Sequence, residues 1–149
     1  MDISRRALLL AAASTPIVAA GCSSDTDTPE APKSPDDAAR TATADSEVEL
    51  IAAYRAAAAA EPGKAATYDF LAKQHEEHLA SVFPDDGQPS VPSPSGTTLN
   101  RKALRQLEQQ AARQRTDAAI TAEDTALVEL LARIAASEAG HAAYLQGGA

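Results

Sequence analysis

The stretch "AASEAGHAAYL", residues 135–145, contains Glu138 and His141 in a segment made mostly of alanine. Residues three positions apart lie on the same face of an α-helix, so these two side chains emerge together. At about 100° per residue, the same face carries Leu127, Leu131, Ile134 and Leu145. The pattern therefore predicts a helix over residues 121–145, N-capped by Thr121, whose Glu–His pair lies in the buried stripe.

A second predicted helix, residues 64–82, repeats the arrangement with two histidines. Its apolar stripe consists of Tyr68, Leu71, Leu79 and Val82. His75 and His78 lie inside this stripe, whereas Glu76 and Glu77 point away from it. All three histidines of the chain are therefore expected on core-facing positions.

Two further helices are predicted over residues 46–60 and 101–119. In the first, Glu47 shares a face with Leu50, Ile51 and Tyr54, whereas Glu49 lies on the opposite side. In the third helix in chain order, Glu108 lies on the side of Leu104 and Ala111. Because no strand pattern is present, the sequence predicts an all-α four-helix bundle over residues 46–146, built from two antiparallel hairpins.

The two hairpins are joined by a loop rich in proline and serine, residues 84–99. If the loop is a turn at one end of the bundle, the polar groups of all four helices lie near the same end. If it crosses the length of the bundle, which an extended segment could do at ~3.1 Å per residue, the two half-sites are expected to separate. Both topologies remain open from the sequence.

Carboxylates in an apolar core need a partner, a proton or a metal ion. Imidazole and carboxylate groups from four helices are the donors that first-row metals bind. The candidate ligands are Glu47, His75, His78, Glu108, Glu138 and His141, and iron, manganese, zinc or copper would suit this set. The alternative is a metal-free cluster of hydrogen-bonded histidines and glutamates.

These residues resemble the dinuclear-metal signature of ferritin-like bundles, in which each helix pair supplies one carboxylate and one Glu-x-x-His motif. Glu138 and His141 match one half of the signature, but His75 stands where the other half has glutamate. The segments "LIAAYRAA", "KQHEEHLASV" and "RIAASEAGHAAYL" are similar to exported, lipid-anchored ferritin-like domain proteins of unknown function from actinobacteria. The resemblance implies a ferritin-like fold and a metal site, with fewer carboxylates than a di-iron centre.

The N-terminus indicates export. Arg5 and Arg6 precede an apolar run, residues 7–20, which as a helix would span only ~21 Å of a ~30 Å hydrocarbon core. Residues 1–21 are therefore interpreted as a signal peptide, and the two arginines leave a twin-arginine route open. Val18–Cys22 resembles a bacterial lipobox, which implies acyl lipid on Cys22; the alternative is an ordinary cleavage site beside an unmodified cysteine.

Residues 22–45 lack large apolar side chains and are predicted to be a disordered tether. Removing residues 1–21 takes away Arg5, Arg6 and Asp2, so the net charge changes from −8 to −9. This acidity excludes nucleic acid as a favoured partner. The lipid anchor is thus expected to hold the domain at the outer face of the cytoplasmic membrane, with no protein partner indicated.

Two functions fit these observations. The first is a membrane-tethered metal-binding protein, which could carry out redox chemistry. The second is a metal-free structural or interaction lipoprotein of the cell envelope. No phosphate-binding loop, Cys-x-x-Cys pair or nucleophile motif is present, so no catalytic residue is assigned. Tyr54, Tyr68 and Tyr144 are expected to be core residues.

Overall fold

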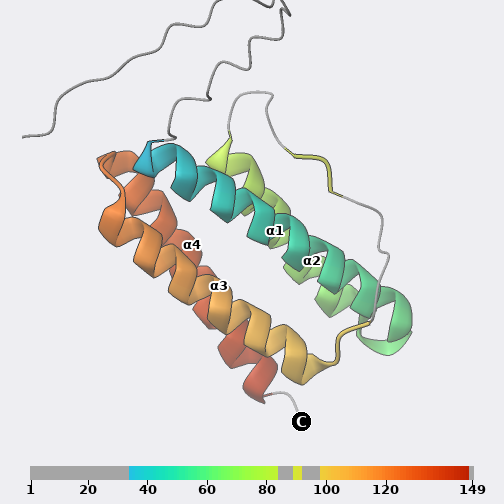
Figure 1. The fold of residues 1–149 in the computed structure, drawn as a ribbon. Coiled ribbons are helices and arrows are strands. Elements are labelled where there is room, and N and C mark those ends of the chain that lie inside the picture. The colour runs from blue at the N-terminus through green and yellow to red at the C-terminus, as the bar shows by residue number, and fades with distance from the viewer. Residues whose placement is uncertain (1–33, 84–88, 92–97, 148–149) are drawn as a thin grey trace, which may run out of the picture. The chain divides into compact units, whose positions relative to one another are not determined.

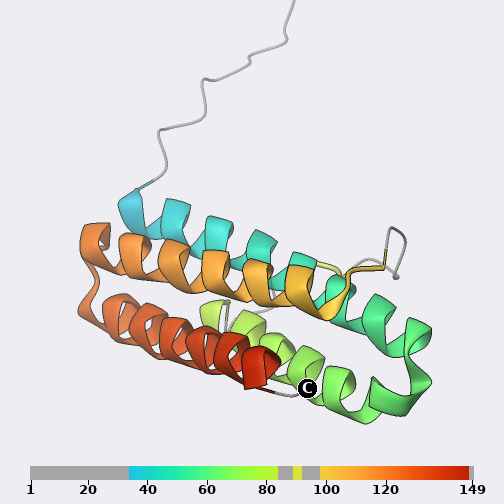
Figure 2. The same ribbon diagram turned by 90° about the horizontal axis from the view of Figure 1, so that it is seen from below.

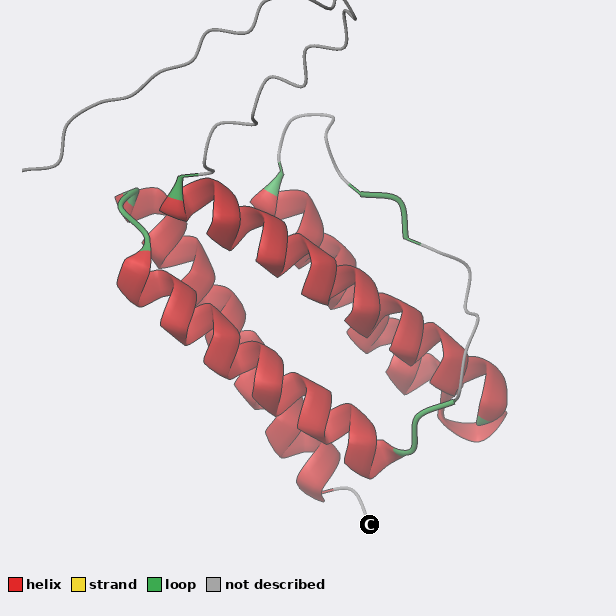
Figure 3. Ribbon diagram, in the orientation of Figure 1, coloured by secondary structure: helices red, strands yellow, loops and turns green. Residues whose placement is uncertain are grey.

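The computed structural model describes residues 34–83, 89–91 and 98–147. The helices are α1 (Pro35–Ala60), the short 3-10 helix η1 (Pro62–Lys64), α2 (Ala65–Val82), α3 (Arg101–Thr121) and α4 (Thr125–Gly147). No strand occurs among these residues (Figure 3). The helices pack as two hairpins, α1 with α2 and α3 with α4, which confirms the all-α prediction.

Helix α1 begins at Pro35, and the prediction of a start at Ser46 after a disordered tether is wrong for residues 34–45. Ser34 caps the helix by accepting a hydrogen bond from the Asp37 backbone N–H, and Pro35 occupies the first turn. Ala39 and Ala44 are buried in this added segment. A segment without large apolar residues therefore packs here because small side chains allow a close approach between helices.

The turn between α3 and α4 also differs from the prediction. Thr121 is the last residue of α3 and is not an N-cap, and α4 begins at Thr125. Asp124 precedes α4, and its carboxylate accepts a hydrogen bond from the Ala126 backbone N–H at 2.9 Å. An aspartate at this position favours the helix start because its charge lies beside unpaired N–H groups.

The start of α1, the end of α2 and the α3–α4 turn meet at one end of the bundle. Arg40 donates to the carbonyl oxygen of Val82 at 3.0 Å, and the Asp36 carboxylate accepts from the Glu123 backbone N–H at 2.8 Å. At the other end, Arg101 at the start of α3 donates to the carbonyl of Tyr144 in α4. Helix α2 therefore ends, and α3 begins, at opposite ends of the bundle (Figure 1), so the chain between them has to join one end to the other.

Around the bundle, α1 lies beside α2 and α3, and α4 lies beside α3 and α2 (Figure 2). The largest core cluster joins Ala57, Tyr68, Leu104 and Leu145 from all four helices. Tyr54 and Tyr68 are core residues as predicted, but Tyr144 is exposed and that prediction is wrong. Among the described helices, none combines the length and apolar character that a bilayer crossing demands.

Residues 1–33 lie outside the described part of the chain, and with them the predicted signal peptide, Cys22 and the first part of the tether. The same holds for residues 84–88 and 92–97 of the predicted loop. Two apolar residues of its described parts, Val91 and Leu99, pack against the core.

The crossing connection does not separate the half-sites, contrary to the prediction for this topology. Because α1 starts at Pro35, Glu47 lies about 18 Å from the shared end of the bundle. Glu108 and Glu138 lie about 20 Å from that end, counted from Thr121 and Thr125. The corrected helix ends therefore bring the polar residues of both hairpins to one level.

Candidate metal centre

His75 of α2 lies at the centre of a buried polar cluster, with no exposed surface of its own. Its Nδ1 is 2.7 Å from Oε2 of Glu47 in α1, and its Nε2 is 3.0 Å from Oε1 of Glu108 in α3. Both carboxylates are fully buried. One imidazole therefore connects the two hairpins.

The first group of candidate ligands consists of Glu47, His75 and His78, whose donor atoms lie within 4.8 Å of one another. His78 follows His75 by one helical turn, and its Nδ1 is 3.7 Å from Oε2 of Glu47. The His78 side chain is 16% exposed, so it lies at the edge of the cluster.

The second group consists of His75, Glu108 and His141, again within 4.8 Å. Nδ1 of His141 is 3.2 Å from Oε1 of Glu108. Nε2 of His141 is 2.6 Å from Oε1 of Gln74, which orients the ring. Tyr54 of α1 donates its hydroxyl hydrogen to Oε1 of Glu108, so Oε1 has three partners. The structure thus brings five of the six predicted ligands into two groups that share His75.

Glu138, the sixth predicted ligand, is fully buried at the same level but belongs to neither group. Among the described residues its ion-pair partner is Arg115 of α3, whose Nη2 is 3.3 Å from Oε1 of Glu138. The same nitrogen lies 3.5 Å from Oε1 of Glu47. Sequence reasoning missed Arg115, although it follows Glu108 and Ala111 on the buried face of α3.

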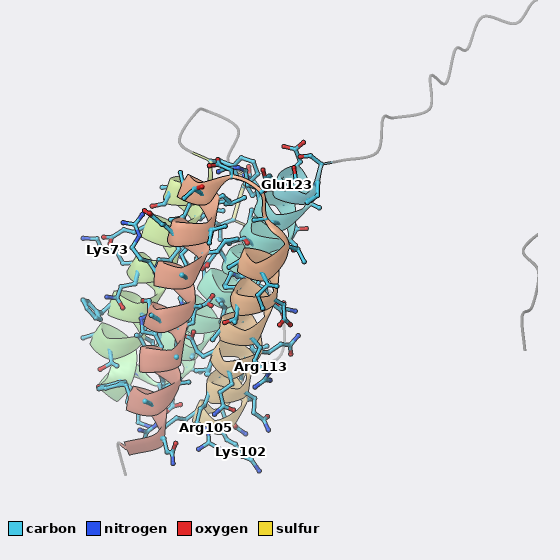
Figure 4. The ribbon with its side chains drawn as sticks, turned by 90° about the vertical axis from the view of Figure 1, so that its left-hand side faces the viewer. Lys73, Lys102, Arg105, Arg113 and Glu123 are labelled. Atoms are coloured by element: carbon cyan, nitrogen blue, oxygen red, sulfur yellow. The ribbon has the colours of Figure 1, made fainter. Side chains whose placement is uncertain are left out.

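The burial of Arg115 contrasts with the other basic residues of this region. Arg113 of α3 and Lys73 of α2 are exposed and project outward from the bundle (Figure 4). Only 1% of Arg115 is exposed. A buried guanidinium requires nearby negative charge, which Glu47 supplies.

The charges of the cluster depend on burial and pairing together. Burial alone would raise the pKa of Glu47 and of Glu108, but hydrogen bonds from the histidines lower both pKa values to about 2. Burial would lower the pKa of His75, yet its bonds to Glu108 and Glu47 raise this pKa to about 9. Burial outweighs the nearby Arg115 and raises the pKa of Glu138 to about 8.

Tyr54 keeps its proton over the whole pH range in which these glutamates and His75 titrate. Burial and the neighbouring Glu108 carboxylate raise the pKa of Tyr54 far above its usual value of 10.0. Its ring also stacks on the His75 ring, with centroids 5.5 Å apart. Tyr54 therefore fixes the orientation of both Glu108 and His75.

Several buried polar atoms of the cluster have no hydrogen-bond partner. They are Nδ1 of His78, Oε2 of Glu108, both carboxylate oxygens of Glu138 and Nε of Arg115. Unpaired buried polar groups are costly and rare. Apart from the Arg115 nitrogen, these atoms belong to predicted ligands, so the donor set fits a transition-metal ion.

Two pockets between α2 and α4 reach the outer histidines. One, of about 520 Å³, is lined by His78 together with Arg40, Glu77 and Ile134. The other, of about 470 Å³, is lined by His141 together with Phe70, Gln74 and Tyr144. Small solutes can therefore approach the imidazoles from this face, whereas the carboxylates are buried behind them.

The stability of the metal-free protein should depend on pH in a way that follows from these pKa values. Glu47 and Glu108 stabilise the fold above pH 4.5, and this contribution is lost as pH falls towards 2. His75 stabilises it below pH 6.5, and this contribution is lost as pH rises through 9. Urea unfolding with a chelator present should give maximal stability near pH 5, with a loss on the order of 3 kcal/mol by pH 3 and a larger loss by pH 9.5, because the raised pKa of Glu138 adds to the effect of His75. A flat profile between pH 3 and 9.5 would contradict this electrostatic description.

Comparisons with known proteins give no relative. No protein-family model matches the chain, and no characterised protein or solved structure matches it either. The four-helix fold does contain a buried cluster of glutamates and histidines that could hold a metal ion.

Proposed function

We propose that this protein is a lipid-anchored, ferritin-like bundle that binds a divalent transition-metal ion between its two helix hairpins. The observation that carries the proposal is the convergence of His75 with two groups of ligands from all four helices. His75, Glu47 and Glu108 are fully buried. Donors from both hairpins converge here on one point of the core.

The ion would be held by imidazole nitrogens from α2 and α4 and by carboxylate oxygens from α1 and α3. To bind the ion through one ring nitrogen, His75 would have to give up the contact between that nitrogen and a carboxylate. Oε2 of Glu108, which has no hydrogen-bond partner, would then be available as a ligand. When bound, the ion would supply Lewis acidity, or one-electron redox chemistry if it is iron, manganese or copper. Tyr54 would keep Glu108 oriented, and the carboxylates would remain shielded from bulk water.

The ferritin-like assignment is supported by the order of ligands along the chain and by the crossing connection. A glutamate on α1, a His-x-x-His pair on α2, a glutamate on α3 and Glu-x-x-His on α4 follow the order of the ferritin-like motif. A long crossover between the second and third helices is also a property of that fold.

The membrane location in this proposal rests on the N-terminal sequence. Cys22, the only cysteine, follows an apolar run and small residues. Labelling with a radioactive fatty acid in an actinobacterial host should mark the wild-type chain but not the Cys22→Ala variant. An unlabelled wild-type chain released into the medium would contradict the anchor.

Metal binding is tested directly on the domain purified with a chelator and then dialysed. We expect Zn²⁺, Mn²⁺, Fe²⁺ or Cu²⁺ to raise the unfolding temperature in proportion to the logarithm of the free metal concentration. Elemental analysis after gel filtration should recover the metal with the protein. A domain that retains no metal, and whose unfolding ignores each of the four ions, contradicts the proposal.

A metal-free interaction lipoprotein is the second candidate, because both ring nitrogens of His75 already have carboxylate partners. The cluster is in this respect a self-contained network. This function predicts that removal of His78 and His141 together leaves unfolding in the presence of metal unchanged. Unfolding of this double variant in the presence of metal therefore distinguishes the two candidate functions.

A further inference from the structure

Arg115 places a permanent positive charge between two of the buried carboxylates. Its Nη2 lies 3.5 Å from Oε1 of Glu47, 3.3 Å from Oε1 of Glu138 and 3.3 Å from the carbonyl oxygen of Thr43. Three oxygens thus surround a single guanidinium nitrogen. Such an oxygen environment is also what a hard or borderline cation would need.

The carboxylate of Glu47 has a different neighbour on each side. Its Oε2 faces the histidines, at 2.7 Å from Nδ1 of His75 and 3.7 Å from Nδ1 of His78. Its Oε1 faces Arg115. A carboxylate between two metal ions would also use one oxygen for each ion. Here the imidazole side could hold an ion, while the opposite side already has a cation.

Glu138 of α4 is the second carboxylate beside Arg115. It is fully buried, yet neither of its oxygens has a hydrogen-bond partner, and Arg115 is its only cationic neighbour within 4.0 Å in the described structure. The separations from Arg115 exceed the roughly 2.7–2.9 Å of charge-assisted hydrogen bonds. The guanidinium therefore acts on Glu47 and Glu138 mainly as a charge.

The charge balance distinguishes one ion from two. With a metal ion bound and the protons of His75 and Glu138 released, Glu47, Glu108 and Glu138 supply three negative charges, and Arg115 offsets one of them. The remaining two match a single divalent ion. A second divalent ion would leave two excess positive charges while Arg115 is present, but only one if Arg115 were replaced by an uncharged side chain. Uncompensated buried charge is strongly unfavourable.

From this geometry we infer that Arg115 occupies the place of a second metal ion, so that the centre binds one divalent ion instead of two. The inference rests on the proposed metal-binding function. It makes Arg115 the residue that sets the stoichiometry of the site, without being a ligand. Replacing it by an uncharged side chain of similar length should open a second position between Glu47 and Glu138.

Mn²⁺ titration of the purified domain, followed by elemental analysis and electron paramagnetic resonance, tests the inference. The wild-type domain should retain one equivalent with the spectrum of isolated Mn²⁺. Arg115→Met should retain two equivalents with an exchange-coupled spectrum. Its first ion should also bind at least about tenfold more tightly, because a nearby positive charge has been removed.

Two control variants separate charge from other effects. Arg113→Met removes a cation from the exposed face of the same helix and should retain one equivalent with unchanged affinity. Arg115→Lys keeps the charge near Glu47 and Glu138 and should also retain one equivalent. Circular dichroism of each variant establishes that the helices are intact. If Arg115→Met does not fold, the wild-type and Arg115→Lys spectra still decide between one ion and a coupled pair.

The outcomes separate this inference from the proposed function. Two coupled ions in the wild-type domain, or one ion in a folded Arg115→Met domain, overturn the inference and leave metal binding intact. No metal in either protein overturns both. Metal in Arg115→Met but none in the wild-type domain also overturns both, because the wild-type centre would then bind no ion.

Discussion

Replacing His75 by alanine should abolish metal binding and destabilise the metal-free domain at the same time. His75 is shared by both groups of candidate ligands and contacts Glu47 and Glu108 on opposite sides of its ring. Its loss leaves these buried carboxylates without their main partner. Breaking a buried ion pair in this way costs about 3–5 kcal/mol. The metal affinity should fall by more than about a hundredfold, since loss of a group that only orients a ligand already costs about 10- to 100-fold.

The two effects are measured separately, by urea unfolding with a chelator and by metal titration under folded conditions. Lys73→Ala is the matched control, because Lys73 lies on the exposed face of the same helix. Its unfolding free energy and metal affinity should remain within about 0.5 kcal/mol of the wild-type values. A folded His75→Ala domain with wild-type metal affinity would exclude His75 as a ligand and remove the main support for the proposed site.

Replacing Glu138 by glutamine should stabilise the metal-free domain at pH 8, in contrast to most substitutions of buried residues. Burial raises the pKa of Glu138 from 4.5 to about 8. The carboxyl therefore keeps its proton in the folded state but loses it on unfolding, so it reduces stability as pH rises from 4.5 to 8. The amide of glutamine has no such penalty. We expect a gain on the order of 3 kcal/mol at pH 8 and almost none at pH 4.

The comparison of unfolding free energies at these two pH values is the decisive measurement for Glu138. Glu129→Gln serves as the control, because Glu129 is exposed on the same helix and its substitution should have no pH-dependent effect. Equal stability of the wild-type and Glu138→Gln domains at pH 8 would show that Glu138 is ionised and well compensated by Arg115. In the presence of metal, the glutamine variant should lose the advantage if Glu138 becomes a ligand.

Together, the two variants separate different parts of the cluster. His75 connects the hairpins through charged hydrogen bonds, so its removal weakens the fold under metal-free conditions. Glu138 has no hydrogen-bond partner in the described structure, and its burial lowers the free energy of unfolding. An unpaired buried carboxylate with a fold-destabilising effect is typical of a functional group, which agrees with the proposed metal site.

The sequence by itself determined which side chains face the core. Helical periodicity places Glu47, His75, Glu108 and Glu138 in apolar stripes, and all four are fully buried in the structure. Periodicity predicts burial because it specifies the angle of each residue about the axis of its own helix. It also explains why the exposed Glu49 and Glu77 were separated correctly from the buried glutamates.

Only the tertiary structure decided the level of each helix and the neighbours of each buried group. Periodicity contains no information on how far one helix is shifted along another, and an error in the start of α1 displaced Glu47 to the end of the predicted bundle. The small residues before Ser46 hid the true start at Pro35, because alanine and threonine pack well only when partner helices are close. Arg115 was missed for a related reason. An arginine is buried only where other elements supply compensating oxygens, and Thr43, Glu47 and Glu138 come from helices distant in sequence.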